Sequence, residues 1–169
     1  MSNRFGPPGR DHHGIPANMF GDVPEDFYGL VGRVVMVAAL VEHRLFNLIC
    51  TLDRRPQQDH AGKSAGGLVD LCIKALASRH QGPDFAAGRP FLVRAREALE
   101  DRNDVVHSLW SPGGQGMACG WRGVRRKQRV TDWKWTRSVE YSENDLDDLV
   151  ERLVALASDL QAFRDRVDR

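Results

Sequence analysis

The stretch Glu97 to Trp110, EALEDRNDVVHSLW, decides how the rest of the chain must be arranged. Apolar residues leading into it recur at helical spacing, and Arg102 falls on the same stripe. That stripe consists of Phe91, Ala95, Ala98, Arg102, Val105 and Leu109. A guanidinium keeps its charge, so a partly buried Arg102 requires a carboxylate or phosphate partner. We expect this helix to continue to a stop at Ser111-Pro112-Gly113-Gly114.

Three polar residues of this helix have a spacing that constrains how they act together. Asn103 and His107 are four residues apart and share one helix face. Arg102 and His107 are five apart, which in a straight helix separates them by about 140° around the axis and about 7–8 Å along it. A kink, the long reach of arginine, or a second copy of the chain is needed to bring both to one ligand.

At these residues the sequence resembles a known family. Arg102-Asn103, three further residues and His107 match the Arg-x4-His pattern of HEPN domains, with a polar residue directly after the arginine. The resemblance extends over about residues 25–167 and implies an all-α, four-helix up-down bundle with no cofactor. Many HEPN domains are metal-independent endoribonucleases that act as homodimers, with both motifs facing one cleft. Leu109 stands where one subgroup has a tyrosine that an antitoxin modifies, so that type of regulation does not fit.

The residues of the motif permit this chemistry. We expect His107 to act as general acid or base, Arg102 to hold the scissile phosphate, and Asn103 to position the substrate or the imidazole. The products are then a 2′,3′-cyclic phosphate and a 5′-hydroxyl. No carboxylate cluster of the two-metal type surrounds the motif, so we predict no metal site. A non-catalytic nucleotide-binding, RNA-binding or oligomerisation module remains the alternative, with His107 capping a backbone carbonyl.

A long helix from about Pro24 to Arg55 precedes the motif and supplies its expected partner. Two apolar stripes on this helix predict a central place in the bundle. The first contains Leu30, Val34, Val37, Val41, Leu45, Leu48 and Leu52, and the second Val31, Val35, Ala38, Phe46 and Ile49. Glu42 falls in the second stripe, where a carboxylate needs a cation. It either faces Arg102 or His107 and orients that side chain as part of the catalytic site, or lies at the helix edge and pairs with a surface arginine or lysine, and the sequence leaves both interpretations open.

The remaining helices are predicted from their first residues. Ser64 is the expected cap of a second helix and Asp84 of a third. Ser142, with Asp145 three residues on, has the pattern of a capping box that begins the last helix. Residues 1–23 read as a flexible arm, so residues 24–169 form one domain.

Before the last helix, residues 117–141 alternate with the period of a β-hairpin. Met117, Cys119 and Trp121 alternate along the first strand, and Trp133, Trp135, Arg137, Val139 and Tyr141 along the second. Seven basic residues and one acid between Arg122 and Arg137 give a local net charge of +6. We expect its basic residues to contact RNA, and at least two of the three tryptophans to pack on the bundle instead. The predicted RNA-binding residues are Arg122, Arg125, Arg126, Lys127 and Arg129.

Composition sets the wider context. The 169 residues carry a net charge of +1, and three widely spaced cysteines give no disulfide framework or zinc pattern. The longest apolar run, Val34 to Val41, is too short to span a membrane, and the N-terminus has no signal sequence. We therefore expect a cytoplasmic homodimer that acts on RNA in a toxin or phage-defence role, with an antitoxin or regulatory protein as a possible partner.

Overall fold

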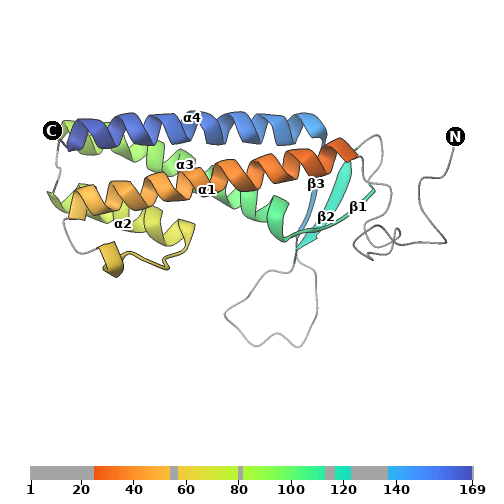
Figure 1. Cartoon of the computed structure of the whole chain (residues 1–169), viewed down its shortest axis with the longest axis horizontal. Helices are drawn as coiled ribbons and strands as arrows, with labels where there is room; N and C mark the ends of the chain where they lie inside the picture. Colours follow the sequence, from red (N-terminus) through yellow and green to blue (C-terminus); the bar gives the residue numbers. More distant parts are fainter. Residues whose placement is uncertain (1–24, 54–56, 80–81, 113–116, 123–136, 169) are drawn as a thin grey trace, which may run out of the picture.

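The computed structural model describes residues 25–53, 57–79, 82–112, 117–122 and 137–168. Four helices lie side by side, with a small sheet at one end of the bundle (Figure 1). In chain order the elements are α1 (Glu25–Asp53), the short turn η2 (Gln57–Asp59), α2 (Ala65–Arg79), α3 (Pro83–His107), β1 (Leu109–Pro112), β2 (Ala118–Arg122), β3 (Arg137–Tyr141) and α4 (Glu143–Val167). The predicted helical bundle with strands inserted before the last helix is confirmed.

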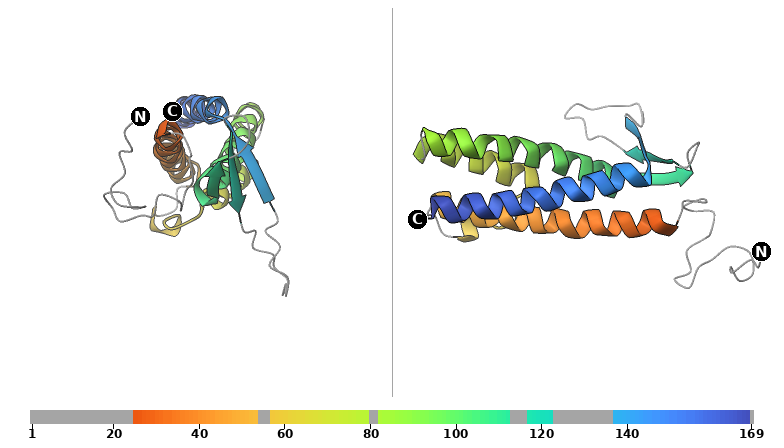
Figure 2. Two further views of the ribbon diagram at one scale, coloured as in Figure 1. Left: turned by 90° about the vertical axis from the view of Figure 1, so that its right-hand side faces the viewer. Right: turned by 90° about the horizontal axis from the view of Figure 1, so that it is seen from above.

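The connection after α1 places α2 where it can take part in a site. Helices α2, α3 and α4 alternate in direction, but the chain returns after α1 to the middle of that helix, so α1 and α2 run the same way (Figures 1 and 2). The expected up-down alternation therefore holds from α2 onward but not between α1 and α2. The Cys72 thiol of α2 donates to the Leu45 carbonyl of α1 over 3.6 Å. As a result, the first turn of α2 lies near the centre of α1 and not at its end.

The core lies between α1 and α4, with α2 and α3 packed against them. The first predicted stripe of α1 is buried except for the partly buried Val37, and Leu45 and Leu48 are fully inaccessible. The apolar stripe of α4 is also buried, apart from the partly buried Val150 and Val167. The second stripe is only partly in the core, because Val35 is 44% exposed. The apolar face of α1 is therefore wider than its neighbours cover, and the prediction that Val35 faces the core is wrong.

Two of the three predicted helix starts agree with the structure. Ser142 and Asp145 form the expected capping box of α4, and the Ser64 hydroxyl accepts from the Gly67 amide over 3.3 Å at the start of α2. The prediction for α3 is wrong, because the helix begins before Asp84. Gly82, with φ of 83°, is its N-cap, and Pro83 occupies the first helical position, where its fixed φ and missing N–H are tolerated.

Helix α3 ends at His107, earlier than the predicted stop at Ser111. Ser108 is extended, and the Trp110 indole N–H turns back to donate to the Val105 carbonyl over 2.9 Å. This bond satisfies one of the carbonyls that a helix end leaves unpaired. The Trp110 ring also packs edge-on against Phe27 of α1 at 5.0 Å between centroids. Leu109 consequently lies in a strand and is 55% exposed, outside the helical stripe to which the sequence assigned it.

The sheet has the antiparallel order β1-β2-β3, so the predicted pair of strands is joined by a third, β1, that the sequence did not indicate. In the register, Ala118 pairs with Tyr141 and Gly120 with Val139. Ala118 and Gly120 are buried against the bundle, whereas Cys119, which alternates with them along β2, is only partly buried. A Cβ on Gly120 would lie 2.8 Å from Trp110 Cζ3, so this glycine permits close packing of the sheet on Trp110. The side chains of the three hairpin tryptophans lie outside the part that is described.

Candidate functional site

An ion pair between α1 and α3 lies at the centre of the candidate site. The Arg102 Nη2 of α3 contacts the Glu42 Oε1 of α1, and the side chains are 16% and 35% exposed. Of the two interpretations of Glu42, the structure therefore has the one in which it faces Arg102. Burial lowers the pKa of the Arg102 guanidinium from its ordinary value. That ordinary value lies so far above neutral pH that the group stays charged, and the carboxylate balances it.

A cavity of about 470 Å³ lies beside this pair and brings the predicted residues together. Glu42, Arg102, Asn103 and His107 all line it. Helix α3 is continuous to His107, so no helix break brings the two sides of the motif to one place. Arg102, which contacts Glu42, and His107 nevertheless line the same cavity, so a continuous helix places both at one site.

Arg102 and His107, the two ends of the motif, differ in solvent exposure. Arg102 is largely buried, and its Nε has no hydrogen-bond partner among the described residues. His107 is exposed in the last turn of α3, and Asn103 is partly buried one turn before it. The Trp110–Val105 hydrogen bond fixes the helix end on which His107 sits. A ligand in the cavity would therefore meet an accessible imidazole and an arginine held in place by a carboxylate.

The cavity is also lined by residues that the sequence did not identify as part of a site. These are Arg96, Leu99 and Glu100 of α3, Ser64, and Ala65 and Gly66 at the start of α2. Arg96 lies seven residues before Asn103, a spacing that places both on one helix face and could have identified it. Nothing in the sequence indicates Ser64–Gly66, because their position depends on the path of the chain after α1.

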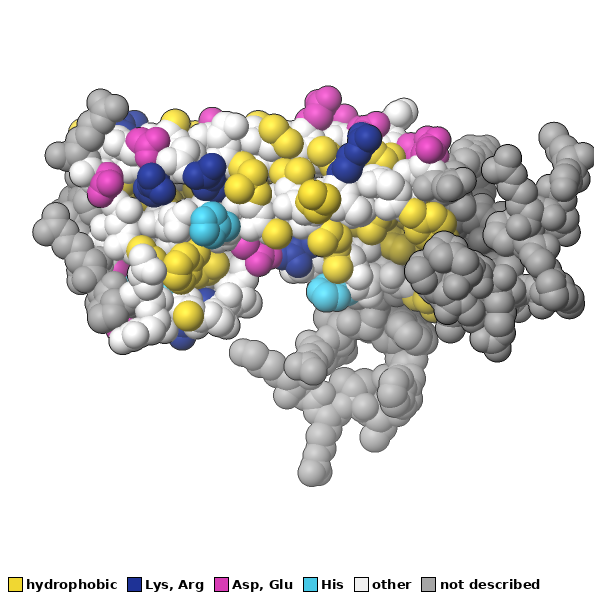
Figure 3. Space-filling view, in the orientation of Figure 1, with side chains coloured by type: hydrophobic (Ala, Val, Ile, Leu, Met, Phe, Trp, Pro, Cys, Tyr) yellow, Lys and Arg dark blue, Asp and Glu magenta, His cyan; other side chains and the backbone are white. Residues whose placement is uncertain are grey.

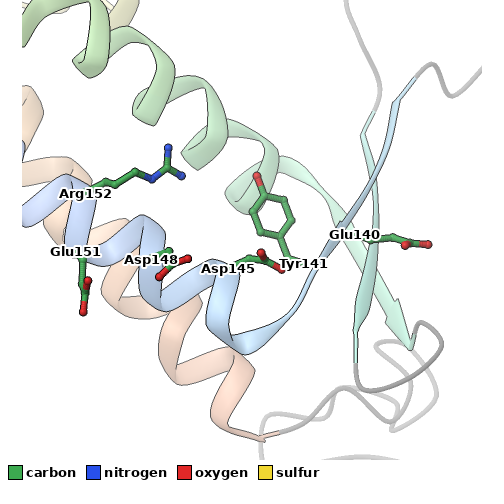
Figure 4. Close-up of a pocket in the computed structure, with 6 residues that line it drawn as sticks. All are labelled: Glu140, Tyr141, Asp145, Asp148, Glu151 and Arg152. Atoms are coloured by element: carbon green, nitrogen blue, oxygen red, sulfur yellow. The ribbon is translucent and has the colours of Figure 1, made fainter.

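A second cavity, of about 420 Å³, lies where the sheet meets α4 and is predominantly acidic, whereas acids and bases are balanced in the first (Figure 4). Its side chains include four acids and one base: Glu140, Asp145, Asp148 and Glu151, with Arg152. Arg152 extends from α4 toward α3, where it pairs with Asp101 over 2.9 Å. This concentration of carboxylates repels a phosphate, so the first cavity is the better candidate for an anionic ligand.

The outward side of α1 is unusually apolar for a surface. Four large hydrophobic side chains are exposed there: Tyr28 at 42%, Val35 at 44%, Met36 at 75% and Leu40 at 43%. Figure 3 shows hydrophobic side chains gathered over α1 on the face turned toward the viewer in Figure 1. By length and composition α1 could cross a membrane, although one side of it is packed in the core of the bundle. We call these four residues the α1 patch.

Several predictions concern groups that the structure does not describe. Arg125, Arg126, Lys127 and Arg129 lie outside the described residues, and Arg122 is the last residue of β2, with a side chain that is not described. Within the described ranges, no group of three or more His, Cys, Asp or Glu side chains is arranged to hold a metal ion.

No protein-family model matches the chain, and no curated protein and no solved structure shows significant similarity to it.

Proposed function

We propose that this chain is a HEPN-type, metal-independent endoribonuclease that works as a homodimer in the cytoplasm, in a toxin or phage-defence role. One observation carries the proposal. Arg102, Asn103 and His107 line one cavity, with Glu42 paired to the arginine. The cavity leaves room for a ligand beside a cation and a proton-exchanging group, which a purely structural ion pair does not require.

The proposed reaction divides between these side chains. The ribose 2′-oxygen attacks the phosphorus and loses its proton to a base, while the P–O5′ bond breaks and the leaving 5′-oxygen takes a proton. An imidazole can both accept and donate a proton, and His107, which is exposed at the cavity, is the group assigned to one of these transfers. Arg102 donates to the phosphate oxygens and offsets their growing charge. Glu42 acts as a positioning residue, because it orients the guanidinium.

The alternative function, a non-catalytic nucleotide-binding, RNA-binding or oligomerisation module, also has an observation in its favour. The Glu42 carboxylate already occupies Arg102, and only 16% of the arginine side chain is accessible. A phosphate must therefore share or displace the carboxylate before Arg102 can act on it. In a structural role, the pair ties α1 to α3 and never opens. RNA cleavage separates the two functions.

The proposed homodimer is supported by the α1 patch. Val35 precedes Glu42 by seven residues, so the two lie on nearly the same helix face, two turns apart. The patch therefore borders the Glu42–Arg102 pair. Between Tyr28 and Leu40 the chain has no acidic residue and a single base, Arg33. A strip that is apolar apart from one arginine can pack on a copy of itself, as a two-fold interface requires, and offers little charge to RNA.

The test is cleavage of total RNA by the purified full chain in excess EDTA. Wild type is expected to cleave, while Arg102→Ala and His107→Ala are each expected to reduce the rate at least about 100-fold, the usual size of a general acid–base or phosphate-binding contribution. The cut ends are expected to carry 2′,3′-cyclic phosphate and 5′-hydroxyl groups, which end-labelling identifies.

Two matched variants control for damage to the fold. His43→Ala removes an exposed helical histidine that bonds Asn47, four residues away, which mirrors the spacing of Asn103 and His107. Arg44→Ala removes a partly buried arginine that bonds Gln161 of α4. Both are expected to cleave like wild type. An inert but folded wild type would instead favour the binding module, and equal cleavage by all variants would place the activity outside this site.

A further inference from the structure

The candidate cavity is longer than the motif. Arg96, Asn103 and His107 follow one another at seven and four residues along α3, so they form a row on a single face. At a rise of 1.5 Å per residue, the eleven residues from Arg96 to His107 span about 16 Å of the helix. All three line the same cavity, opposite the first turn of α2. The cavity is thus a groove along α3, with the motif at one end only.

The far end of the groove has its own cation. The Arg96 guanidinium contacts the Asp70 carboxylate of α2, and the two side chains are 39% and 67% exposed. An ion pair this accessible contributes little and exchanges readily with other partners. The Glu42–Arg102 pair at the motif end is far less exposed. Arg96 is therefore able to exchange its carboxylate for a phosphate without uncovering a buried charge.

The middle of the groove is less suited to a phosphate. Glu100 lies one turn after Arg96 and is exposed, and Leu99 beside it is buried. A carboxylate there repels a phosphate but tolerates a sugar or a base. The first-turn amides of α2 on the opposite wall lack intrahelical acceptors, as at any helix start. The groove therefore has cations toward its two ends, with a span between them that has no cation on α3.

We propose that Arg96 binds a second phosphate of the substrate, so that the groove takes a polynucleotide strand and discriminates against a mononucleotide. The proposal rests on the proposed function and specifies its substrate class. Arg96 and Arg102 are six residues apart on α3, about 9 Å along the helix axis. A strand in a duplex advances about 3.4 Å of axis per phosphate, so the two arginines are separated by more than one such step. A mononucleotide reaches only one of the two arginines.

The test measures binding to the full chain carrying His107→Ala, which prevents cleavage during the measurement. The probes are adenosine monophosphate and a fluorescent eight-residue oligouridylate, each titrated at several salt concentrations. Adding Arg96→Ala is expected to weaken oligouridylate binding about tenfold, as for one charge-assisted contact. The slope of log affinity against log salt is expected to fall by about 0.7. Binding of adenosine monophosphate is expected to be unchanged.

Helix α3 itself provides the matched control. Arg94 is also exposed and pairs with an aspartate of a neighbouring helix, Asp159 of α4, over 2.9 Å, but it lies outside the groove. Arg94→Ala is expected to leave both affinities unchanged. Asp70→Asn distinguishes phosphate binding by Arg96 from a structural role of its ion pair, because it breaks the ion pair and keeps the guanidinium. It is expected to preserve or strengthen oligouridylate binding.

The outcomes distinguish the two proposals. If wild type cleaves RNA but Arg96→Ala binds oligouridylate like its parent, the second phosphate site is wrong and the proposed function stands. If Asp70→Asn weakens binding as much as Arg96→Ala, Arg96 serves only as a tie to α2, and the inference is again overturned. If the parent binds no oligouridylate and wild type cleaves no RNA, both proposals fail.

Discussion

Gly88 shows how a single missing side chain holds the bundle together. It lies inside α3, where glycine normally costs stability, but a Cβ there would lie 2.5 Å from Phe163 Cζ and 2.9 Å from Leu76 Cδ1. Three helices therefore meet at this position because it has no side chain. The sequence shows Gly88 only as a disturbance near the start of a helix, whereas the structure gives it a packing role.

Gly88→Ala is accordingly expected to destabilise the protein. The strain of overpacking, about 1–3 kcal/mol, outweighs the gain in helix propensity of about 1 kcal/mol. Urea unfolding of dilute protein measures the difference. Gly32→Ala is the control, because nothing lies within 4 Å of its Cβ position and the residue is exposed. It is expected to stabilise by about 0.5–1 kcal/mol. A Gly88→Ala protein more stable than wild type would contradict this packing.

At the scale of an element, the capping box of α4 links local sequence to pH. The Asp145 carboxylate accepts from the Ser142 hydroxyl at 2.6 Å and from the Ser142 amide at 2.7 Å. These hydrogen bonds lower the pKa of Asp145 in the folded state. Because the folded pKa lies below the unfolded one, the cap stabilises the protein fully above the unfolded value of about 4. Its contribution is lost as the pH falls through the folded value.

Asp145→Ala is therefore expected to lower the free energy of unfolding by about 0.5 kcal/mol at pH 7, with the deficit shrinking toward zero as the pH falls through the lowered pKa of the folded state. Urea titrations between pH 7 and 2.5 measure it. Asp147→Ala removes a nearby exposed acid outside the box and is expected to show no such convergence. A deficit that stays constant down to pH 2.5 would mean that the carboxylate does not support the cap.

Elements were predictable where the deciding interactions are local. The apolar stripe of α4, its capping box and the motif helix follow from periodicity and from residues three or four apart. The early end of α3 was not predictable, because it depends on the Trp110 bond to Val105 and on contacts with Phe27, far away in the chain. The same limit applies to the site. Glu42 was named from its place in an apolar stripe, and Asn103 and His107 from the resemblance to the Arg-x4-His pattern, but the wall formed by Ser64–Gly66 depends on the tertiary path.

At the scale of the whole molecule, the α1 patch is the feature that a single copy leaves unexplained. Four of the exposed large hydrophobic side chains in the described part lie on α1, on the side that the other helices do not cover. On α4, by contrast, Val154 is the single residue of this kind, with 49% of it exposed. An isolated apolar side chain on a surface is ordinary, but a contiguous strip indicates an interface. A second copy would cover the strip and bring its own Glu42–Arg102 pair close to the same border.

Val35→Lys is expected to convert the dimer to monomer, since a buried, unpaired charge at the centre of an interface costs several kcal/mol. Sedimentation velocity across a range of concentrations measures the change. Val154→Lys introduces the same charge at matched exposure, 49% against 44%, and is expected to remain dimeric.

A wild type that is monomeric at high concentration would contradict the dimer. If it then pellets with anionic phospholipid vesicles, and Val35→Lys does not, the patch binds a lipid surface instead, in keeping with the length and apolar character of α1.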